Sequence, residues 1–374
     1  IVKVKNLEIG GDTPIKVQTM CNTHTQDVAP SVAQCVEMAK AGAQLIRLTT
    51  QGMKEVEALA EIKKELVVMG IETPLVADVH FSSEIAIEAA KVVEKVRINP
   101  GNFHKDHEKA REQFAKLVSV CKEHGTAIRI GLNHGSLGDR ITNLYGNTPL
   151  AMKEAVMEWL DMCVENDFFN VVVSLKASNT FVMVEAYRLL HNEMQQKGIV
   201  FPLHLGVTEA GNGDSGRIKS AVGISALLSE GIGNTVRVSL TENPVNELPV
   251  ARTIADYFYK GEYKGNWILQ NNNPAVHYEC ESWDEFIIKA SCDFGPLLLD
   301  KQIDDFVNVY LSLIDARMLT FIEDENGDLG WYLLDPACAV KLNLNGSDYP
   351  ILTNAIPAIL DLDAAQDLDR RKQM

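Results

Sequence analysis

KVRINPGNFHKDHEKAREQFAKLVSVCKEHGTAIRIGLN, residues 95–133, contains one complete strand–helix–strand unit. Its two ends are short apolar runs of strand length. Its middle, residues 108–125, repeats apolar residues at the three- and four-residue spacing of an amphipathic helix. Each strand carries one arginine, Arg97 or Arg129, among its apolar residues. Because buried parallel strands are normally unbroken apolar runs, a charge inside one needs a partner.

The same alternation of strand and helix occurs eight times in the first 260 residues. Eight such units in about 250 residues match the size of a (β/α)8 barrel. We therefore predict an α/β TIM barrel followed by a smaller α+β unit, with a doubly wound open sheet as the alternative. The strands are predicted at 15–20, 44–49, 74–79, 95–99, 127–132, 170–175, 202–207 and 235–239. Further helices are predicted at 28–43, 53–66 and 150–166.

Basic side chains occupy matching positions on five of these strands, in a chain whose formal net charge is −16. Alternate strand residues face the same side of a sheet, and the polar residues of each strand share one parity. They also gather toward the strand C-termini, where barrel active sites lie. This pattern predicts a pocket at the barrel mouth for a strongly anionic ligand such as a diphosphate. The polar residues that share one parity, strand by strand, are Arg47 and Thr49, Asp78 and His80, Arg97 and Asn99, Arg129 and Asn133, Ser174 and Lys176, His204 and Thr208, and Arg237 and Ser239. Taken alone, His80 or His204 fits a core histidine equally well, and Asp78 fits a loop cap.

The composition and charge of the chain favour some classes of protein and disfavour others. With 46% apolar residues the chain can bury a full core, and no apolar run approaches the ~18 residues of a membrane span. Residues 1–265 carry 28 Lys+Arg against 32 Asp+Glu, whereas residues 266–374 carry 7 against 19, a balance of −12. We expect the barrel to occupy 1–265 and an acidic domain to occupy 266–374. No basic cluster suggests nucleic-acid binding, and the acidic face fits a solvated surface better than a site for a basic partner.

The seven cysteines contain no C-x-x-C pair, which favours a reducing compartment and disfavours a complete iron–sulfur or zinc site.

In the acidic part, NNNPAVHYEC (271–280) is typical of a loop. SWDEFIIKAS (282–291) is typical of a helix capped by Ser282 with Glu285 three residues later. FIEDENGDLGWYLL (321–334) suggests a hairpin that turns at Asn326-Gly327. Residues 361–374 are polar, and we expect them to fray.

The segment LHLGVTEAGNGDSGRIKSAVG (203–223) follows the seventh predicted strand and places three glycines, Gly211, Gly213 and Gly216, in G-x-G-x-x-G spacing. A dinucleotide fold would need this pattern in the first βα unit. After the seventh strand it instead suits the phosphate-binding loop of a barrel, where backbone N–H groups approach an anion.

The ordered motifs resemble one family, 4-hydroxy-3-methylbut-2-enyl diphosphate synthase of the methylerythritol phosphate route to isoprenoids, in its three-domain form. They cover essentially all of residues 1–258. The motifs are PIKVQTMCNTHTQD (14–27), PLVADVHF (74–81), KVRINPGN (95–102), IRIGLNHGSL (128–137), VVSLKAS (172–178), PLHLGVTEAG (202–211), IKSAVGISALLSEGIG (218–233) and TVRVSLTENPVNE (235–247).

The resemblance implies reductive ring opening of 2-C-methyl-D-erythritol 2,4-cyclodiphosphate with loss of a hydroxyl. It implies that Arg97, Arg129, Lys176, Arg237 and Ser239 bind the diphosphate, with Asn99 and Asn133 as supporting donors. Arg47 joins this set by its strand position. It implies a polar rim of Asp78, His80, His204, Thr208 and Glu209 near the reacting carbons, of which Glu209, Asp78 and His80 are the catalytic candidates. Glu209 is the candidate for proton transfer, or else a salt-bridge partner that orients Lys176 or an arginine.

The resemblance also implies a [4Fe–4S] cluster fed by ferredoxin or flavodoxin, a possible homodimer, and a place in the bacterial cytoplasm or the plastid stroma. The cluster domain of that family is not recognisable here, so we predict no metal ligands and expect this chain alone to bind substrate without turning it over. Two rivals stay open. One is a class I aldolase-type barrel that forms a Schiff base on Lys176, and the other is a non-catalytic diphosphate-binding subunit. A pterin-binding barrel is disfavoured by five cations where a neutral pterin would have to fit.

Overall fold

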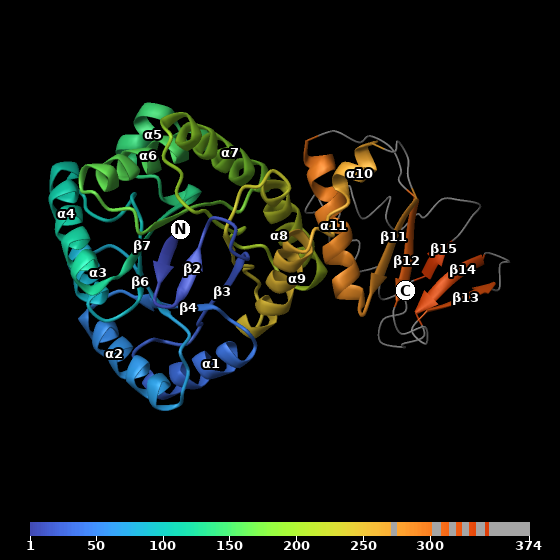
Figure 1. Ribbon diagram of the computed structural model, residues 1–374, viewed down its shortest axis with the longest axis horizontal. Helices are drawn as coiled ribbons and strands as arrows, with labels where there is room; N and C mark the ends of the chain where they lie inside the picture. Colours follow the sequence, from blue (N-terminus) through green and yellow to red (C-terminus); the bar gives the residue numbers. More distant parts are fainter. Residues whose placement is uncertain (271–274, 301–307, 314–318, 324–328, 334–340, 344–374) are drawn as a thin grey trace.

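The computed structural model describes residues 1–270, 275–300, 308–313, 319–323, 329–333 and 341–343 (Figure 1). Eight parallel strands form the central sheet in the order β8-β7-β6-β5-β4-β3-β10-β9. The two edge strands also meet, because Val173 of β8 pairs with Leu203 and its N–H donates to the Pro202 carbonyl at 2.9 Å. The sheet therefore closes into a ring, which confirms the predicted barrel. The strands are β3 (Lys16–Met20), β4 (Leu45–Thr50), β5 (Leu75–Val79), β6 (Lys95–Ile98), β7 (Ala127–Asn133), β8 (Val171–Lys176), β9 (His204–Leu205) and β10 (Thr235–Val236).

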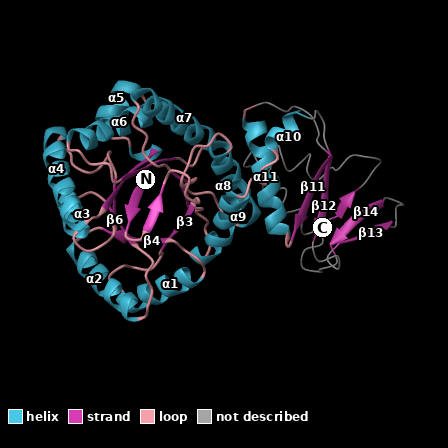
Figure 2. Ribbon diagram, in the orientation of Figure 1, coloured by secondary structure: helices cyan, strands magenta, loops and turns pink. Residues whose placement is uncertain are grey.

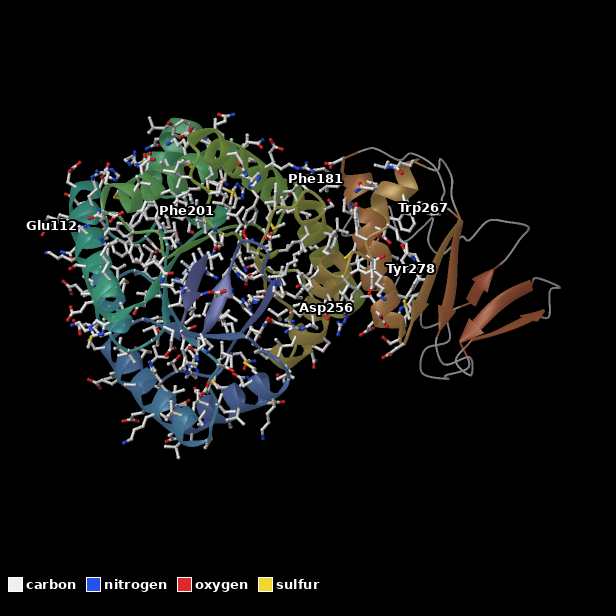
Figure 3. All side chains as sticks on the ribbon, in the orientation of Figure 1. Glu112, Phe181, Phe201, Asp256, Trp267 and Tyr278 are labelled. Atoms are coloured by element: carbon white, nitrogen blue, oxygen red, sulfur yellow. The ribbon has the colours of Figure 1, made fainter. Side chains whose placement is uncertain are left out.

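Helices surround this ring, and their side chains fill the layer between helices and strands (Figures 2 and 3). Several begin at side-chain caps that satisfy free backbone N–H groups: Ser82 accepts from Ile85 N at 3.3 Å, and Asp106 from Lys109 N at 3.0 Å. Thr148 caps the helix whose first residue is Pro149. The helices are α1 (Val28–Lys40), α2 (Met53–Val68), α3 (Ser83–Ala90), α4 (His107–His124), α5 (Asp139–Tyr145), α6 (Pro149–Glu165), α7 (Thr180–Lys197), α8 (Gly213–Leu228) and α9 (Glu247–Tyr259), with short 3-10 turns η1 (His134–Ser136) and η2 (Pro244–Asn246).

An antiparallel hairpin, β1 (Val2–Val4) and β2 (Leu7–Ile9), covers the N-terminal end of the barrel. Its apolar residues pack with Leu45, Val76, Ala127 and Val172, the first inward-facing residues of four barrel strands. The floor of the barrel is therefore largely apolar, and Lys95, which lies opposite Val76 and Ala127 in the register, is the basic residue at this level of β6.

The part of the chain after the barrel packs on α8 through α11 (Trp283–Leu299). The approach is close, since a Cβ on Gly295 would lie 2.5 Å from Val222 Cγ2. The predicted cap of α11 is confirmed, with Glu285 N donating to Ser282 Oγ at 3.2 Å. Asp293 of α11 accepts from Tyr257 of α9 at 2.7 Å and from Tyr278 of the preceding strand, β11, at 2.5 Å. These two hydrogen bonds connect α9, β11 and α11. The other elements are α10 (Gly265–Gln270), β11 (Ala275–Cys280), β12 (Asn308–Leu313), β13 (Leu319–Glu323), β14 (Leu329–Leu333) and β15 (Lys341–Asn343).

The expectation of a loop at 271–280 was wrong for residues 275–280, because β11 pairs in parallel with β12 over all six residues. The predicted hairpin is confirmed by the antiparallel pairing of β13 with β14. Its turn at Asn326-Gly327, and the tail 361–374, lie outside the described residues. A domain boundary near residue 265 remains our proposal. Among the described helices, none combines the length and apolar character that crossing a membrane would require.

Candidate anion site in the barrel interior

Strand register brings the predicted basic residues together inside the barrel. Asp78 of β5 lies opposite Arg97 of β6, and Arg97 lies opposite Arg129 of β7. Two inward positions nearer the mouth, beyond Gly131, Asn133 lies opposite Lys176 of β8. The shared parity of these residues was therefore a correct guide to the face on which they lie. Arg97, Arg129 and Lys176 are all buried.

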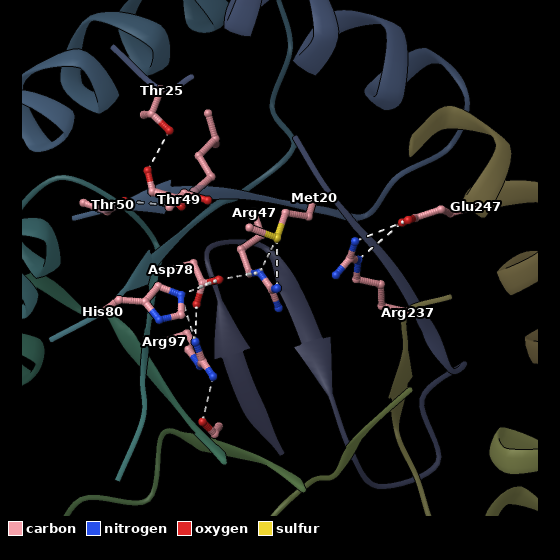
Figure 4. A network of polar contacts seen from close by, with 12 residues as sticks. Met20, Thr25, Arg47, Thr49, Thr50, Asp78, His80, Arg97, Arg237 and Glu247 are labelled. Atoms are coloured by element: carbon pink, nitrogen blue, oxygen red, sulfur yellow. Dashed lines mark hydrogen bonds and ion pairs between the residues drawn. The ribbon is translucent and has the colours of Figure 1, made fainter. Parts of the chain in front are cut away.

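Asp78 is the centre of one charged network (Figure 4). Its Oδ1 accepts from Arg97 Nη1 at 2.8 Å, and its Oδ2 lies 3.2 Å from Arg47 Nε and 3.3 Å from His80 Nε2. Burial alone would raise the pKa of Asp78, but the guanidinium groups of Arg47 and Arg97 outweigh it and hold that pKa well below its usual range. Asp78 is thus an ionised carboxylate that fixes two arginines.

A second carboxylate, Glu247 at the start of α9, fixes the arginine on the opposite side (Figure 4). Arg237 donates from Nε to Oε2 and from Nη2 to Oε1, each at 3.3 Å. Glu247 also accepts from Thr19 Oγ1 and from the Leu240 backbone N–H, each at 3.2 Å. The Arg237 guanidinium is therefore held at two points.

The remaining cations lack such partners. Within the described residues, Arg129 Nε and Nη1 are buried and bonded to nothing, and so is Lys95 Nζ at the next inward position below Arg97. Burial, with neighbouring guanidinium groups, lowers the pKa values of Arg129, Lys95 and Lys176 well below their usual ranges. Burying a charged donor without an acceptor is costly. These donors are therefore placed for an acceptor supplied from outside the chain.

Two glycines make room for this arrangement. A Cβ on Gly131 would lie 2.8 Å from Arg97 Nε and 3.1 Å from both Arg129 Nε and Ser174 Oγ. A Cβ on Gly206 would lie 2.9 Å from Lys176 Nζ and 2.4 Å from the Arg237 carbonyl oxygen. Any side chain at either position would push against the basic groups.

The interior therefore sets six basic side chains against two buried carboxylates, Asp78 and Glu247. The basic residues are Arg47, Lys95, Arg97, Arg129, Lys176 and Arg237. Charge-assisted hydrogen bonds from such groups to phosphate oxygens are worth about 1.5–3 kcal/mol each. Chemically, the site can hold a compact ligand with several negative charges.

Comparison with known proteins gives the family of this barrel. The GcpE TIM-barrel domain model matches residues 1–252. The chain belongs to the GcpE family. A 4-hydroxy-3-methylbut-2-en-1-yl diphosphate synthase (flavodoxin) of Parabacteroides distasonis is 44% identical over 342 residues, which cover 84% of this chain and 55% of that protein. The Bacteroides fragilis enzyme of the same name is 51% identical over 68% of this chain and 44% of its own length.

A chloroplastic ferredoxin-type synthase of Oryza sativa is 46% identical over 68% of this chain and 37% of its own length. The GcpE chain described here thus spans about half the length of the bacterial relatives that it matches. The family assignment rests on the barrel, residues 1–252.

The structure places the other predicted residues of this GcpE barrel at different depths. Asn99 is buried and donates to Ser136 Oγ at 2.9 Å, while Asn133, Thr208 and Ser239 are half-buried at strand ends. Glu209 is exposed on the loop before α8, with a left-handed φ of 53°. Among the described contacts it has no ion pair with Lys176 or an arginine, so the salt-bridge alternative finds no support.

His204 differs from expectation in position. Like Asp78, it is expected on the rim, yet both residues are buried below the mouth. His204 Nδ1 lies 3.3 Å from Gln18 Nε2 and 3.4 Å from Thr235 Oγ1. Burial and the nearby Lys176 and Arg129 lower its pKa well below the usual range. This environment fits the other interpretation of His204, a neutral histidine of the protein core.

Three residues were missed by reading the sequence. Lys95 shares the inward parity of Arg97 and could have been found by the same rule. Gln18 sits at an inward position of β3 and contacts His204. Glu247 follows Arg237 by ten residues in a different element, and no local pattern marks that contact.

The cysteines of this GcpE chain do not form a cluster site within the described residues, where no group of three or more His, Cys, Asp or Glu side chains could hold a metal. Cys21 and Cys35 lie close, with 3.6 Å between sulfurs, but both are buried, and the hydrogen bond with Cys35 and burial raise the pKa of Cys21. Burial also raises the pKa values of Cys121 and Cys163. Thiolate ligands are disfavoured in such places, so the cysteines in the described part of the chain do not fit an iron–sulfur cluster.

Proposed function

We propose that this chain supplies the substrate-binding barrel of a 4-hydroxy-3-methylbut-2-enyl diphosphate synthase. The substrate would be 2-C-methyl-D-erythritol 2,4-cyclodiphosphate, whose ring is opened reductively with loss of a hydroxyl. The observation that carries the proposal is the buried, partner-free guanidinium of Arg129 among further cations, in a barrel of the GcpE family. A cyclic diphosphate supplies the acceptor oxygens that these donors lack.

The depth of the charges suggests how the substrate lies. Arg97, Arg129 and Lys176 are buried, so the phosphates enter first and the carbon skeleton remains toward the mouth. Arg47 and Arg237 are held by Asp78 and Glu247 to meet the phosphates from two sides. Asn99, Asn133 and Ser239 would add neutral donors or acceptors at the strand ends. Prearranged donors of this kind bind an anion without reorganisation.

At the mouth, His80, Thr208 and Glu209 would face the reacting carbons. Glu209 is exposed on a loop, so it can exchange protons with solvent, and we assign it the proton transfer to the departing oxygen. The left-handed backbone at Glu209 is a strained conformation of the kind that gathers at functional sites. Asp78 acts by positioning Arg47, Arg97 and His80.

The reaction also needs two electrons. In the relatives' names the donors are flavodoxin and ferredoxin, and the resemblance adds a [4Fe–4S] cluster. Since the described residues do not fit that cluster, we assign this chain only binding and proton handling. The proposal includes a flavodoxin or ferredoxin partner, a homodimer, and work in the bacterial cytoplasm or, in a plant, the plastid stroma.

Calorimetric titration tests the proposal. The cyclodiphosphate should bind the chain, 2-C-methylerythritol without phosphates should not, and Arg97→Ala should weaken binding at least about tenfold, or about 1.4 kcal/mol. Equal binding of the two ligands, or no binding of either, would contradict the proposal.

A class I aldolase-type reaction remains the second candidate because burial lowers the pKa of Lys176 well below its usual range. A neutral amine is the form that attacks a carbonyl. Borohydride trapping with a phosphorylated ketose distinguishes the two: a reduced adduct on Lys176 supports the aldolase, and unmodified Lys176 removes it.

A further inference from the structure

Phe81 stands at the mouth of the barrel in an unusual state. Its side chain is 75% exposed, more than any other aromatic side chain that the structure describes. Its backbone is left-handed, with φ of 64°. Bulky residues rarely adopt this conformation, because their Cβ crowds the backbone, and such strain tends to persist where function requires it.

The backbone turn itself has a clear purpose. It lies between His80, which points into the barrel and contacts Asp78 and Arg97, and Ser82, which caps α3 through its hydroxyl. Glycine or asparagine would make the same turn at lower cost. The backbone therefore explains the turn but not the aromatic ring, whose apolar surface is left in water.

The position of the ring indicates its use. The Phe81 ring centroid lies 5.8 Å from that of His80, and His80 Nε2 lies 3.2 Å from Arg97 Nη1. The ring is therefore next to the anion site but on its solvent side, where a phosphate oxygen has no reason to lie. A ligand whose phosphates are held by Arg97 would extend its carbon atoms toward this ring.

We propose that Phe81 is a specificity residue that covers the carbon skeleton of the phosphorylated substrate and so favours an organic cyclic diphosphate over inorganic diphosphate. This inference rests on the proposed function. Apolar cover of this kind contributes only when the ligand has carbons to bury. The arginine and lysine groups deeper in the barrel serve both ligands alike.

The test compares two ligands on three chains by calorimetry. Phe81→Asn removes the ring and tolerates the left-handed turn, whereas Phe81→Leu keeps apolar bulk. Lys5→Asn, at a φ of 55° in the hairpin at the other end of the barrel, relieves similar strain and serves as the matched control. We expect Phe81→Asn to weaken binding of the cyclodiphosphate about tenfold, or about 1.4 kcal/mol, and to leave binding of inorganic diphosphate unchanged. Phe81→Leu should lose less, and Lys5→Asn should lose nothing.

The outcomes separate this inference from the proposed function. If the parent chain binds both ligands and Phe81→Asn loses affinity for neither, or for both equally, the specificity role is wrong while the anion site stands. If the parent chain binds neither ligand, the proposed function fails and this inference fails with it. Unfolding by urea, in which Phe81→Asn should be at least as stable as the parent, confirms that any loss does not come from misfolding.

Discussion

Asp78 and Arg97 lie directly opposite each other on β5 and β6, and Asp78 Oδ1 accepts from Arg97 Nη1 at 2.8 Å. The same carboxylate holds Arg47 on its other side, at 3.2 Å. One buried anion thus holds a cation on each side, the buried Arg97 and the half-buried Arg47. Asp78 offsets part of the positive charge inside the barrel, and the charge that remains is the basis of the proposed anion site.

Asp78→Asn should destabilise the barrel. It leaves Arg47 and Arg97 without their carboxylate, and breaking a buried pair costs about 3–5 kcal/mol. Because the pKa of Asp78 is held well below its usual range, its contribution is present above the unfolded value of about 3.9 and is lost as pH falls below that value. Urea unfolding should therefore show a large difference between parent and variant at pH 7 that narrows toward pH 3.

The control is Asp161→Asn, which removes a half-exposed carboxylate 3.1 Å from Lys197 on the surface. It should leave stability nearly unchanged at both pH values. A gap between parent and Asp78→Asn that does not depend on pH would mean that the Asp78 carboxylate is not the group responsible.

Gly131→Ala should weaken anion binding by about tenfold or more, or at least about 1.4 kcal/mol. The new methyl would stand 2.8 Å from Arg97 Nε and 3.1 Å from Arg129 Nε, so both guanidinium groups must shift. Gly135→Ala is the matched control, since a Cβ there meets nothing within 4 Å. Titration with inorganic diphosphate measures the effect, and equal losses for the two variants would contradict the explanation.

Glu247→Gln should reduce affinity for the diphosphate about three- to tenfold, because a neutral amide holds a guanidinium less firmly than a carboxylate does. Arg237 then loses its two-point alignment, and because the amide keeps a single oxygen, only one of Thr19 Oγ1 and the Leu240 N–H retains its acceptor. Glu165→Gln, which alters an exposed partner of Arg111, should have no effect on affinity. Unchanged affinity in Glu247→Gln would show that Arg237 does not need this alignment.

Asp293 should make stability fall as pH rises. Burial raises its pKa to about 6, despite hydrogen bonds from Tyr278 and Tyr257. A carboxyl whose folded pKa is raised stabilises most below its unfolded value, about 3.9, and that contribution is lost as pH rises through about 6. Asp293→Asn should remove this slope between about pH 4 and pH 6.5, measured by urea unfolding. Identical slopes in parent and variant would contradict the assignment.

Much of the fold was predictable because the barrel repeats one local rule. Apolar strands alternate with amphipathic helices, and inward parity follows from the two-residue period of a strand. That rule located Asp78, Arg97, Arg129 and Lys176 on one face before their partners were known. The same rule places Lys95 on that face, although it lies at the N-terminal end of its strand, away from the strand C-termini where the other polar residues gather.

The remaining features depend on contacts between distant segments. The predicted strands 202–207 and 235–239 contain only two ladder residues each, β9 and β10, because the chain leaves the sheet before the polar strand ends. The sequence predicts a loop at β11 because three asparagines and Pro274 precede it. Its pairing with β12 depends on residues about 30 positions later in the chain. Neither the hold of Glu247 on Arg237 nor the burial of His204 can be read from neighbouring residues.

We propose that the buried, partner-free cations inside this barrel bind an organic diphosphate. The most direct measurement is calorimetric titration of Arg129→Met with 2-C-methyl-D-erythritol 2,4-cyclodiphosphate, beside Arg140→Met, which removes an exposed arginine paired with Glu158. We predict that Arg129→Met loses at least about tenfold in affinity, or about 1.4 kcal/mol, while Arg140→Met binds as the parent does. Parent-like binding by Arg129→Met would contradict the claim.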